Sequence, residues 1–158
     1  MLCYSAQNVL SFNYTDTQGY VSTQYIRSVS IVIMTIIMRR QMHGRQPLTE
    51  TQLAANYSIP VRMVSSICNK LHSAGMIYYV KEDKDAEGVA PAIDTSTFTL
   101  GEFLRRLDKE GKSDFIPGFE HHFSPLLKEV SDALQEPFKQ ADSVLMSQLT
   151  LPPSENRK

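Results

Sequence analysis

Residues 49–76 read TETQLAANYSIPVRMVSSICNKLHSAGM, and this stretch decides the fold. Thr49 and Gln52 form a capping box, in which the side chain of each residue binds the free backbone N–H group of the other at the start of a helix. The capping box predicts a short helix that continues to about Tyr57. This helix is the first half of a recognisable pair.

The second helix of the pair follows a turn at Ser58-Ile59. Pro60 suits the first turn of a helix because its missing N–H group would have no partner there. Gly75 supplies the left-handed residue that ends the helix. Between them, apolar side chains recur at i, i+3, i+4 and i+7, namely Val64, Ile67, Cys68 and Leu71. Two helices joined by about three residues form a helix-turn-helix.

The residues after Gly75 predict a β-hairpin, the wing. Residues 76–80 (MIYYV) are apolar and aromatic, residues 81–88 form a charged loop, and residues 89–93 return as a second strand. A further helix starts at a second capping box, Thr99 with Glu102, and stops at Gly111. The sequence therefore predicts a winged helix-turn-helix, mainly α with a small β-hairpin wing, between flanking N-terminal and C-terminal helices.

A long N-terminal helix is predicted from Ser22 to Met42, and it carries two apolar stripes on nearly opposite sides. One winged-helix domain covers only one stripe. A large apolar patch left in water is rare on soluble monomers. We therefore predict self-association of two copies through the second stripe, with residues 1–12 or the last helix as alternative covers. The side chains assigned to this contact are Ile31, Met34 and Met38.

The predicted parts of the chain are four. Residues 1–21 form an apolar N-terminal segment and a turn, residues 22–111 the winged-helix domain with its long first helix, residues 112–151 a helical extension and residues 152–158 a disordered tail. Within the extension, Pro137 is expected to kink or break the helix, because a proline removes one backbone hydrogen bond and clashes with the preceding turn.

The composition is that of a soluble globular protein, with 42% hydrophobic and 21% charged residues. The longest apolar run, residues 29–38, is shorter than the roughly 20 residues that a membrane span needs. Cys3 and Cys68 fit neither a metal-binding spacing nor a C-x-x-C redox motif, which favours a reducing compartment. No secretory signal is visible.

Catalytic chemistry has no support in the sequence. Of the four histidines, only His121 and His122 lie close together, and adjacent side chains point apart in a helix or strand. The seven glycines form no phosphate-binding loop and no nucleophile elbow. We expect no catalytic residue, metal site or cofactor, no evident small-molecule ligand, and a protein that is not an enzyme.

Nucleic-acid binding has a candidate surface on the second helix of the pair. Arginine pairs with guanine and asparagine with adenine in the major groove. Residues 1–80 carry six Lys and Arg against two acidic residues, a net charge of +4. The wing loop 81–88 carries a net charge of −2, which repels phosphate. DNA contact is therefore not favoured over protein contact, and its candidate residues are Arg62, Ser65, Ser66, Asn69 and Lys70.

An ordered series of short motifs resembles the C-terminal part of the YihY/BrkB family, inner-membrane proteins long described as ribonuclease BN. The resemblance implies a cytoplasmic winged-helix tail behind a bundle of membrane helices, so that residues 1–12 would end the last membrane helix. The motifs are Gln7-Asn8-Val9, Leu48-Thr49, Ile59-Pro60, Ala74-Gly75-Met76-Ile77, Pro91-Ala92-Ile93-Asp94, Thr99-Leu100-Gly101 and the ending Leu104, Leu107 and Gly111.

Two classes of function follow. The first is a tail at the cytoplasmic face of the bacterial inner membrane, in contact with its own membrane bundle and with a second copy, and active in assembly or regulation. The alternative is a free-standing winged-helix DNA-binding transcription regulator. A tRNA-processing ribonuclease is a distant third, implied by the family resemblance alone.

Overall fold

The computed structural model describes residues 21–81 and 86–152. The chain divides into two compact units, residues 1–32 and 33–158, which are taken separately. The predicted membrane-proximal segment, the tip of the wing and nearly all of the predicted disordered tail lie outside the described residues. Helix α2 (Thr23–Met42) crosses the boundary between the units and matches the long helix predicted from the sequence.

In the first unit, local hydrogen bonds explain how a serine-containing segment forms a helix. The Ser22 hydroxyl accepts a hydrogen bond from the backbone N–H of Tyr25 at 3.1 Å, which caps the first turn. The hydroxyls of Ser28 and Ser30 donate to the carbonyl oxygens of Gln24 and Ile26, one turn earlier. Such back-bonding satisfies a polar side chain without ending the helix.

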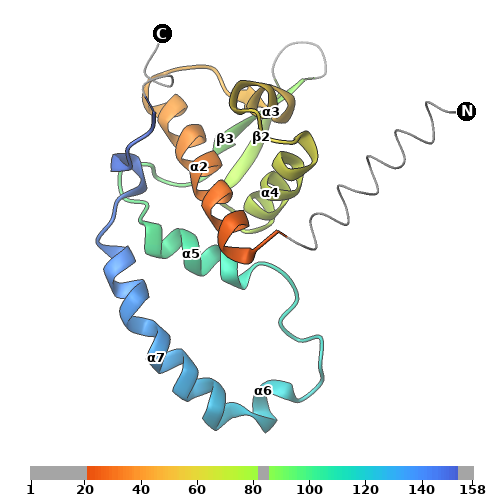
Figure 1. The fold of residues 1–158 in the computed structure, drawn as a ribbon, viewed down its shortest axis with the longest axis vertical. Helices are drawn as coiled ribbons and strands as arrows, with labels where there is room; N and C mark the ends of the chain where they lie inside the picture. Colours follow the sequence, from red (N-terminus) through yellow and green to blue (C-terminus); the bar gives the residue numbers. More distant parts are fainter. Residues whose placement is uncertain (1–20, 82–85, 153–158) are drawn as a thin grey trace, which may run out of the picture. The chain divides into compact units, whose positions relative to one another are not determined.

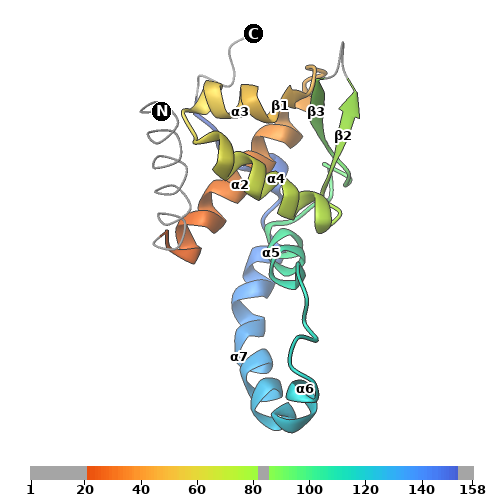
Figure 2. The same cartoon turned by 90° about the vertical axis from the view of Figure 1, so that its right-hand side faces the viewer.

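The second unit contains the predicted helix-turn-helix, α3 (Glu50–Tyr57) and α4 (Val61–Ser73). Figure 2 shows the two helices crossing beside the sheet. The capping box is present: the Gln52 N–H donates to Thr49 Oγ1 at 3.1 Å, and the Thr49 N–H donates to Gln52 Oε1 at 3.0 Å. The turn passes through Ser58 in a left-handed conformation with φ of 54°. Gly75 ends α4 with φ of 71°.

The wing is an antiparallel hairpin of β2 (Ile77–Lys81) and β3 (Glu87–Pro91). A third strand, β1 (Leu48–Thr49), pairs with β3 on its other edge, so the strand order is β1-β3-β2. The sequence predicted the hairpin and missed β1. A strand of two residues has no periodicity to detect, and its pairing with β3 is a long-range contact.

The second half of α2 lies in the core of the second unit. Six consecutive residues, Ile33 to Met38, are buried. At 3.6 residues per turn, six residues point in every direction around the helix axis, so this part of α2 is enclosed on all sides. The expectation that one domain covers only one stripe of this helix is therefore wrong.

Helix α5 (Leu100–Lys109) starts at Thr99, whose hydroxyl accepts a hydrogen bond from the Glu102 N–H at 3.1 Å. In the predicted capping box, the Glu102 side chain would bind the backbone N–H of Thr99. Instead, the Glu102 carboxylate accepts a hydrogen bond from Arg106 at 2.7 Å. Helix α5 is followed by α6 (Phe119–His122) and α7 (Ser124–Asp142). Helix α7 runs alongside α5 (Figure 1) and continues through Pro137, so the expected break is absent.

The segment after α7 returns to the winged helix. Thr99 and Leu145 form a β-bridge, the Leu100 N–H donates to the Val144 carbonyl at 2.8 Å, and the Met146 N–H donates to the Phe98 carbonyl at 3.1 Å. The guanidinium of Arg39 donates to the carbonyl oxygens of Ser147 and Leu149 in and after η1 (Met146–Gln148). Met146 is fully buried. The C-terminal segment is therefore part of the core.

Candidate nucleic-acid interface

Helix α4 has one buried face and one exposed face. Met63, Val64, Ile67, Cys68 and Leu71 are buried. On the opposite side, Arg62, Asn69 and Ser73 are exposed and Ser66 is half-buried. These four residues recur at i, i+4, i+7 and i+11, so they form one stripe along the helix. Lys70 is exposed at the edge of this stripe.

Ser65 departs from the prediction, because it lies at a flank of α4 and is half-buried. Its hydroxyl donates a short hydrogen bond to Oε2 of Glu50, the first residue of α3. Successive residues of a helix are rotated by 100° about the helix axis. The side chain of Ser65 therefore points away from the stripe that contains its neighbour Ser66. Ser65 therefore contacts protein, whereas the side chains of Arg62, Asn69 and Lys70 are exposed and Ser66 is half-buried beside them.

Glu50 also binds the wing. The hydroxyl of Tyr79, in β2, donates to Glu50 Oε1 at 2.7 Å. The Tyr79 ring meets the ring of His72 edge-on, with centroids 5.3 Å apart. His72 Nδ1 donates in turn to the carbonyl oxygen of Ile77 at 3.1 Å. Burial, followed by the hydrogen bond to Glu50, raises the pKa of Tyr79.

Sequence reasoning missed this polar cluster of Glu50, Ser65, His72 and Tyr79. In the sequence, Glu50 is one of the two acidic residues among residues 1–80, and no pattern there indicates its partners. One signal was present in the sequence: Ser65 and His72 are seven residues apart, so they share a flank of α4. The strand partner could not be identified without the register of the sheet.

Cys68 is buried beside this cluster. Burial, followed by the negative charge of Glu50, raises the pKa of its thiol to about 12. The thiolate is the nucleophile and the metal ligand, so a thiol with this pKa is unreactive near neutral pH. Cys68 therefore packs as a small apolar side chain.

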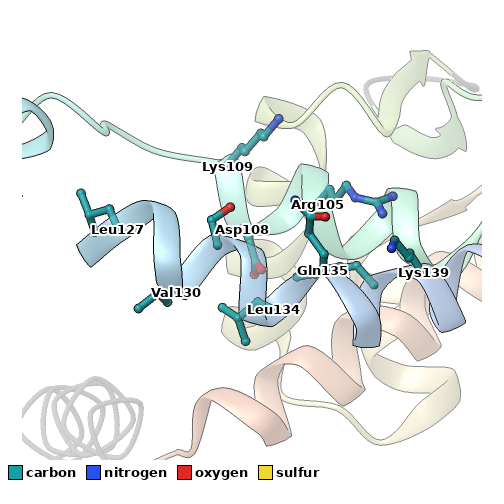
Figure 3. Close-up of a pocket in the computed structure, with 10 residues that line it drawn as sticks. Arg105, Asp108, Lys109, Leu127, Val130, Leu134, Gln135 and Lys139 are labelled. Carbon is teal, nitrogen blue, oxygen red and sulfur yellow. The ribbon is translucent and has the colours of Figure 1, made fainter. Parts of the chain in front are cut away.

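A second feature is a groove of about 580 Å³ between α5 and α7. Its inner end is closed by Arg105, whose guanidinium donates two hydrogen bonds to Asp142 at 2.5 and 2.6 Å and lies over the Phe138 ring. The hydrogen bonds from Arg105 lower the pKa of Asp142. Figure 3 shows the residues along the groove, which are Arg105, Asp108, Lys109, Leu127, Val130, Ser131, Leu134, Gln135, Phe138 and Lys139.

Helix α7 exposes an apolar stripe next to the groove. Leu126, Val130 and Leu134 recur at i, i+4 and i+8, and their exposed fractions are 57%, 46% and 52%. No residue of this 19-residue helix is buried. Within the part of the chain that the structure describes, the stripe is therefore left without a cover.

The residues assigned to self-association lie elsewhere. Met34 and Met38 are fully buried within the chain, and Ile31 is half-buried. An exposed stripe at these positions does not exist, because the whole circumference of α2 at Ile33 to Met38 is enclosed. The premise for pairing two copies through Met34 and Met38 is wrong.

The paired histidines lie in α6. His122 packs edge-on against Phe123, with ring centroids 4.8 Å apart, and both histidine side chains are exposed. Among the described residues, no three His, Cys, Asp or Glu side chains are grouped closely enough to hold a metal ion.

Two solved structures have a fold similar to this one, whereas no family model and no curated protein sequence matches the chain. CymR (YrzC), the global cysteine regulator of B. subtilis, is 19% identical, with a TM-score of 0.51 over 80% of this chain and 92% of CymR. IscR of T. potens is 17% identical, with a TM-score of 0.52 over 84% of this chain and 93% of IscR. The fold is a winged helix-turn-helix. At these identities the likeness shows the fold alone.

The resemblance to the YihY/BrkB family is wrong. CymR is named as a regulator, and its likeness extends over four fifths of the chain. The motifs misled because they are the winged helix itself: Leu48-Thr49 opens α3, Ile59-Pro60 opens α4 and Gly75-Met76 closes it. Any winged helix needs such signals at these points, so they do not distinguish one family from another.

The expectations that depended on this resemblance fall with it. They are the location at the inner membrane, the membrane bundle as partner, the assembly role of a membrane-protein tail and the ribonuclease alternative. Across residues 21–81 and 86–152, no helix has the length and apolar character needed to cross a membrane.

Proposed function

We propose that this chain is a DNA-binding transcription regulator of the Rrf2 type, the type that CymR and IscR represent. One observation carries the proposal: a winged helix like that of CymR presents a polar stripe on its second helix-turn-helix helix, where Arg62, Ser66 and Asn69 face outward. This helix is the recognition helix in helix-turn-helix proteins, and it enters the major groove.

The residue types in the stripe suit base recognition. Arg62 stands in the first turn of α4, the end of a recognition helix that reaches the base edges. An arginine side chain can donate two hydrogen bonds to guanine, and an asparagine can pair with adenine. Asn69 lies seven residues later, on the same side. The stripe therefore offers two base-reading side chains with serines beside them.

The acidic wing loop argues against strong contact between the wing and the phosphate backbone. Residues 81–88 carry two lysines and four acidic residues. The basic residues of the first half of the chain, with a net charge of +4 over residues 1–80, supply the opposite field. We infer that α4 provides most of the affinity and that the wing contributes little to phosphate binding.

We infer further that two copies pair through α7. The stripe of Leu126, Val130 and Leu134 is exposed next to the groove, and apolar surface gains about 25 cal/mol per Å² when it is removed from water. Two-fold pairing also lets a helix-turn-helix protein read two half-sites.

DNA binding is tested by selecting duplexes from a genomic fragment pool and measuring the dissociation constant of the best site by fluorescence anisotropy. Arg62→Ala should weaken that site by about 1–3 kcal/mol, roughly 5- to 150-fold, and relax the base preference at one position. Lys112→Ala, which removes an exposed positive charge outside α4, is the matched control and should leave affinity within about twofold. A wild-type protein that binds all duplexes equally would overturn the proposal.

Pairing through α7 is tested by sedimentation velocity at micromolar concentrations. The wild-type chain should sediment as a dimer, and Val130→Glu with Leu134→Glu should give a folded monomer, because two carboxylates would be buried without partners. Lys128→Glu makes the same change in charge at an exposed position of α7 outside the groove lining and should stay dimeric. A wild-type monomer, or a dimer that survives the double change, contradicts this interface.

A further inference from the structure

Glu50 connects three elements of the winged helix through one carboxylate. It is the first residue of α3, directly after Thr49 of β1. Its Oε2 atom accepts the hydrogen bond from Ser65 of α4, and its Oε1 atom accepts the hydrogen bond from Tyr79 of β2 at 2.7 Å. Both oxygens are therefore engaged, one by the recognition helix and one by the wing.

The contacts on α4 lie on one flank of the helix at two heights. Ser65 and His72 are seven residues apart, close to two full turns, so their side chains point in the same direction about 10 Å apart along the axis. Tyr79 reaches Glu50 with its hydroxyl and the His72 ring with its own ring. His72 also donates a hydrogen bond to the carbonyl oxygen of Ile77, two residues before Tyr79.

These contacts join α4 to the wing strand β2 at two positions along the helix: Ser65 through Glu50, and His72 directly. A single hydrogen bond would permit α4 to rotate about it. Two contacts separated along the helix axis fix both its rotation about its axis and its height relative to β2. The exposed stripe of Arg62, Ser66 and Asn69 lies on the same rigid helix, so its direction is fixed as well.

We propose that Glu50 is a positioning residue for DNA recognition: its carboxylate, through Ser65 and Tyr79, sets the orientation of the recognition helix relative to the wing. The proposal rests on the DNA-binding function proposed above. Glu50 and Ser65 touch no base in this arrangement; they act through Arg62 and Asn69. Loss of the carboxylate should reduce specific affinity and leave non-specific affinity unchanged, because phosphate contacts do not depend on Glu50.

The first experiment compares Tyr79→Phe, Ser65→Ala and Glu50→Gln in the same binding assay. Tyr79→Phe and Ser65→Ala each remove one donating hydroxyl, and Glu50→Gln replaces one accepting oxygen by an NH2 group that cannot accept, all with nearly unchanged side-chain volume. The affinity for the best site should fall about 5- to 20-fold, non-specific affinity should stay within twofold, and the slope of affinity against salt concentration should not change. The loss in the Ser65→Ala, Tyr79→Phe double variant should be at least as large as that of Glu50→Gln, whose amide oxygen still accepts one hydrogen bond. Thr51→Ser, an exposed change beside Glu50, is the control.

The second experiment does not involve DNA. Tyrosine ionisation is followed by absorbance near 295 nm as pH is raised, and the Tyr79→Phe difference isolates one residue. In the wild-type chain this residue should ionise above the usual pH range of a tyrosine, and Glu50→Gln should bring its ionisation to lower pH. If wild-type protein selects no DNA site, the proposed function fails and the titration alone decides whether Glu50 holds Tyr79. Unchanged binding specificity in all three variants, or an unchanged titration in Glu50→Gln, overturns the positioning role.

Discussion

At the scale of single residues, the environment of a side chain decides its chemistry more than its type does. Cys68 sits on the apolar side of α4, and burial together with the charge of Glu50 keeps its thiol protonated. Ser65 and Ser66 are adjacent and identical, yet one donates to Glu50 and the other belongs to the exposed stripe. The rotation of 100° per residue along the helix accounts for the difference.

The raised pKa of Cys68 predicts a pH dependence of stability. The pKa of the thiol is about 12 in the folded chain against 9.0 ordinarily, so the neutral thiol stabilises the fold fully below pH 9. This contribution is lost as pH rises from 9 towards 12. The difference in unfolding free energy between wild type and Cys68→Ala should therefore shrink over that range in urea titrations. A difference that stays constant with pH would contradict the prediction.

At the scale of elements, the close contact between α5 and α7 limits the size of the side chains that fit between them. Gly101 of α5 faces the end of α7, where an added Cβ atom would lie 2.0 Å from Asp142 Oδ1 and 2.8 Å from the Asp142 backbone nitrogen. Asp142 is also the partner of Arg105. Glycine is a poor helix former, so its presence in the first turn of α5 is explained by the contact between α5 and α7.

Gly101→Ala should destabilise the chain although alanine is the better helix former. Overpacking costs about 1–3 kcal/mol. The better helix propensity of alanine relative to glycine stabilises by at most about 1 kcal/mol, so the overpacking dominates. The midpoint of thermal unfolding measures the net effect, and Lys109→Ala, at an exposed position of the same helix, should change it little. An increase in stability for Gly101→Ala would show that the end of α7 moves away freely.

At the scale of the whole molecule, residues 98–100 and 144–149 join segments far apart in the sequence. The return of the chain after α7 places Met146 in the core and supplies two carbonyl oxygens to Arg39 of α2. The stretch predicted to be a helical extension thus contributes to the winged-helix core. Its two ends differ: residues 144–149 are packed, and α7 exposes its apolar stripe.

Met146→Ala tests this closure. Removing a fully buried methionine side chain costs about 2–5 kcal/mol, because it loses burial and leaves a cavity. Urea unfolding should show this loss, whereas Gln148→Ala, two residues away and exposed, should stay within about 0.5 kcal/mol of wild type. Equal stability of the two variants would mean that residues 144–149 do not support the core.

The sequence by itself determined the local elements. The capping box at Thr49 and Gln52, the proline before α4, the glycine after it and the apolar strands of the wing are signals that act over a few residues, and the structure has each of them. These signals established the winged helix. They misled about family, because the same local signals serve any winged helix.

Only the tertiary structure decided which surfaces are free. In the structure, Met34 and Met38 are buried, and Ser65 contacts Glu50. Tyr79 lies beside α4 and binds Glu50. The stripe of Leu126, Val130 and Leu134 is exposed. Each of these depends on contacts between residues far apart in the chain, such as the pairing of β1 with β3 and of Thr99 with Leu145. Helical periodicity tells which side chains share a face, but the partner of that face is set by packing, which one helix cannot encode.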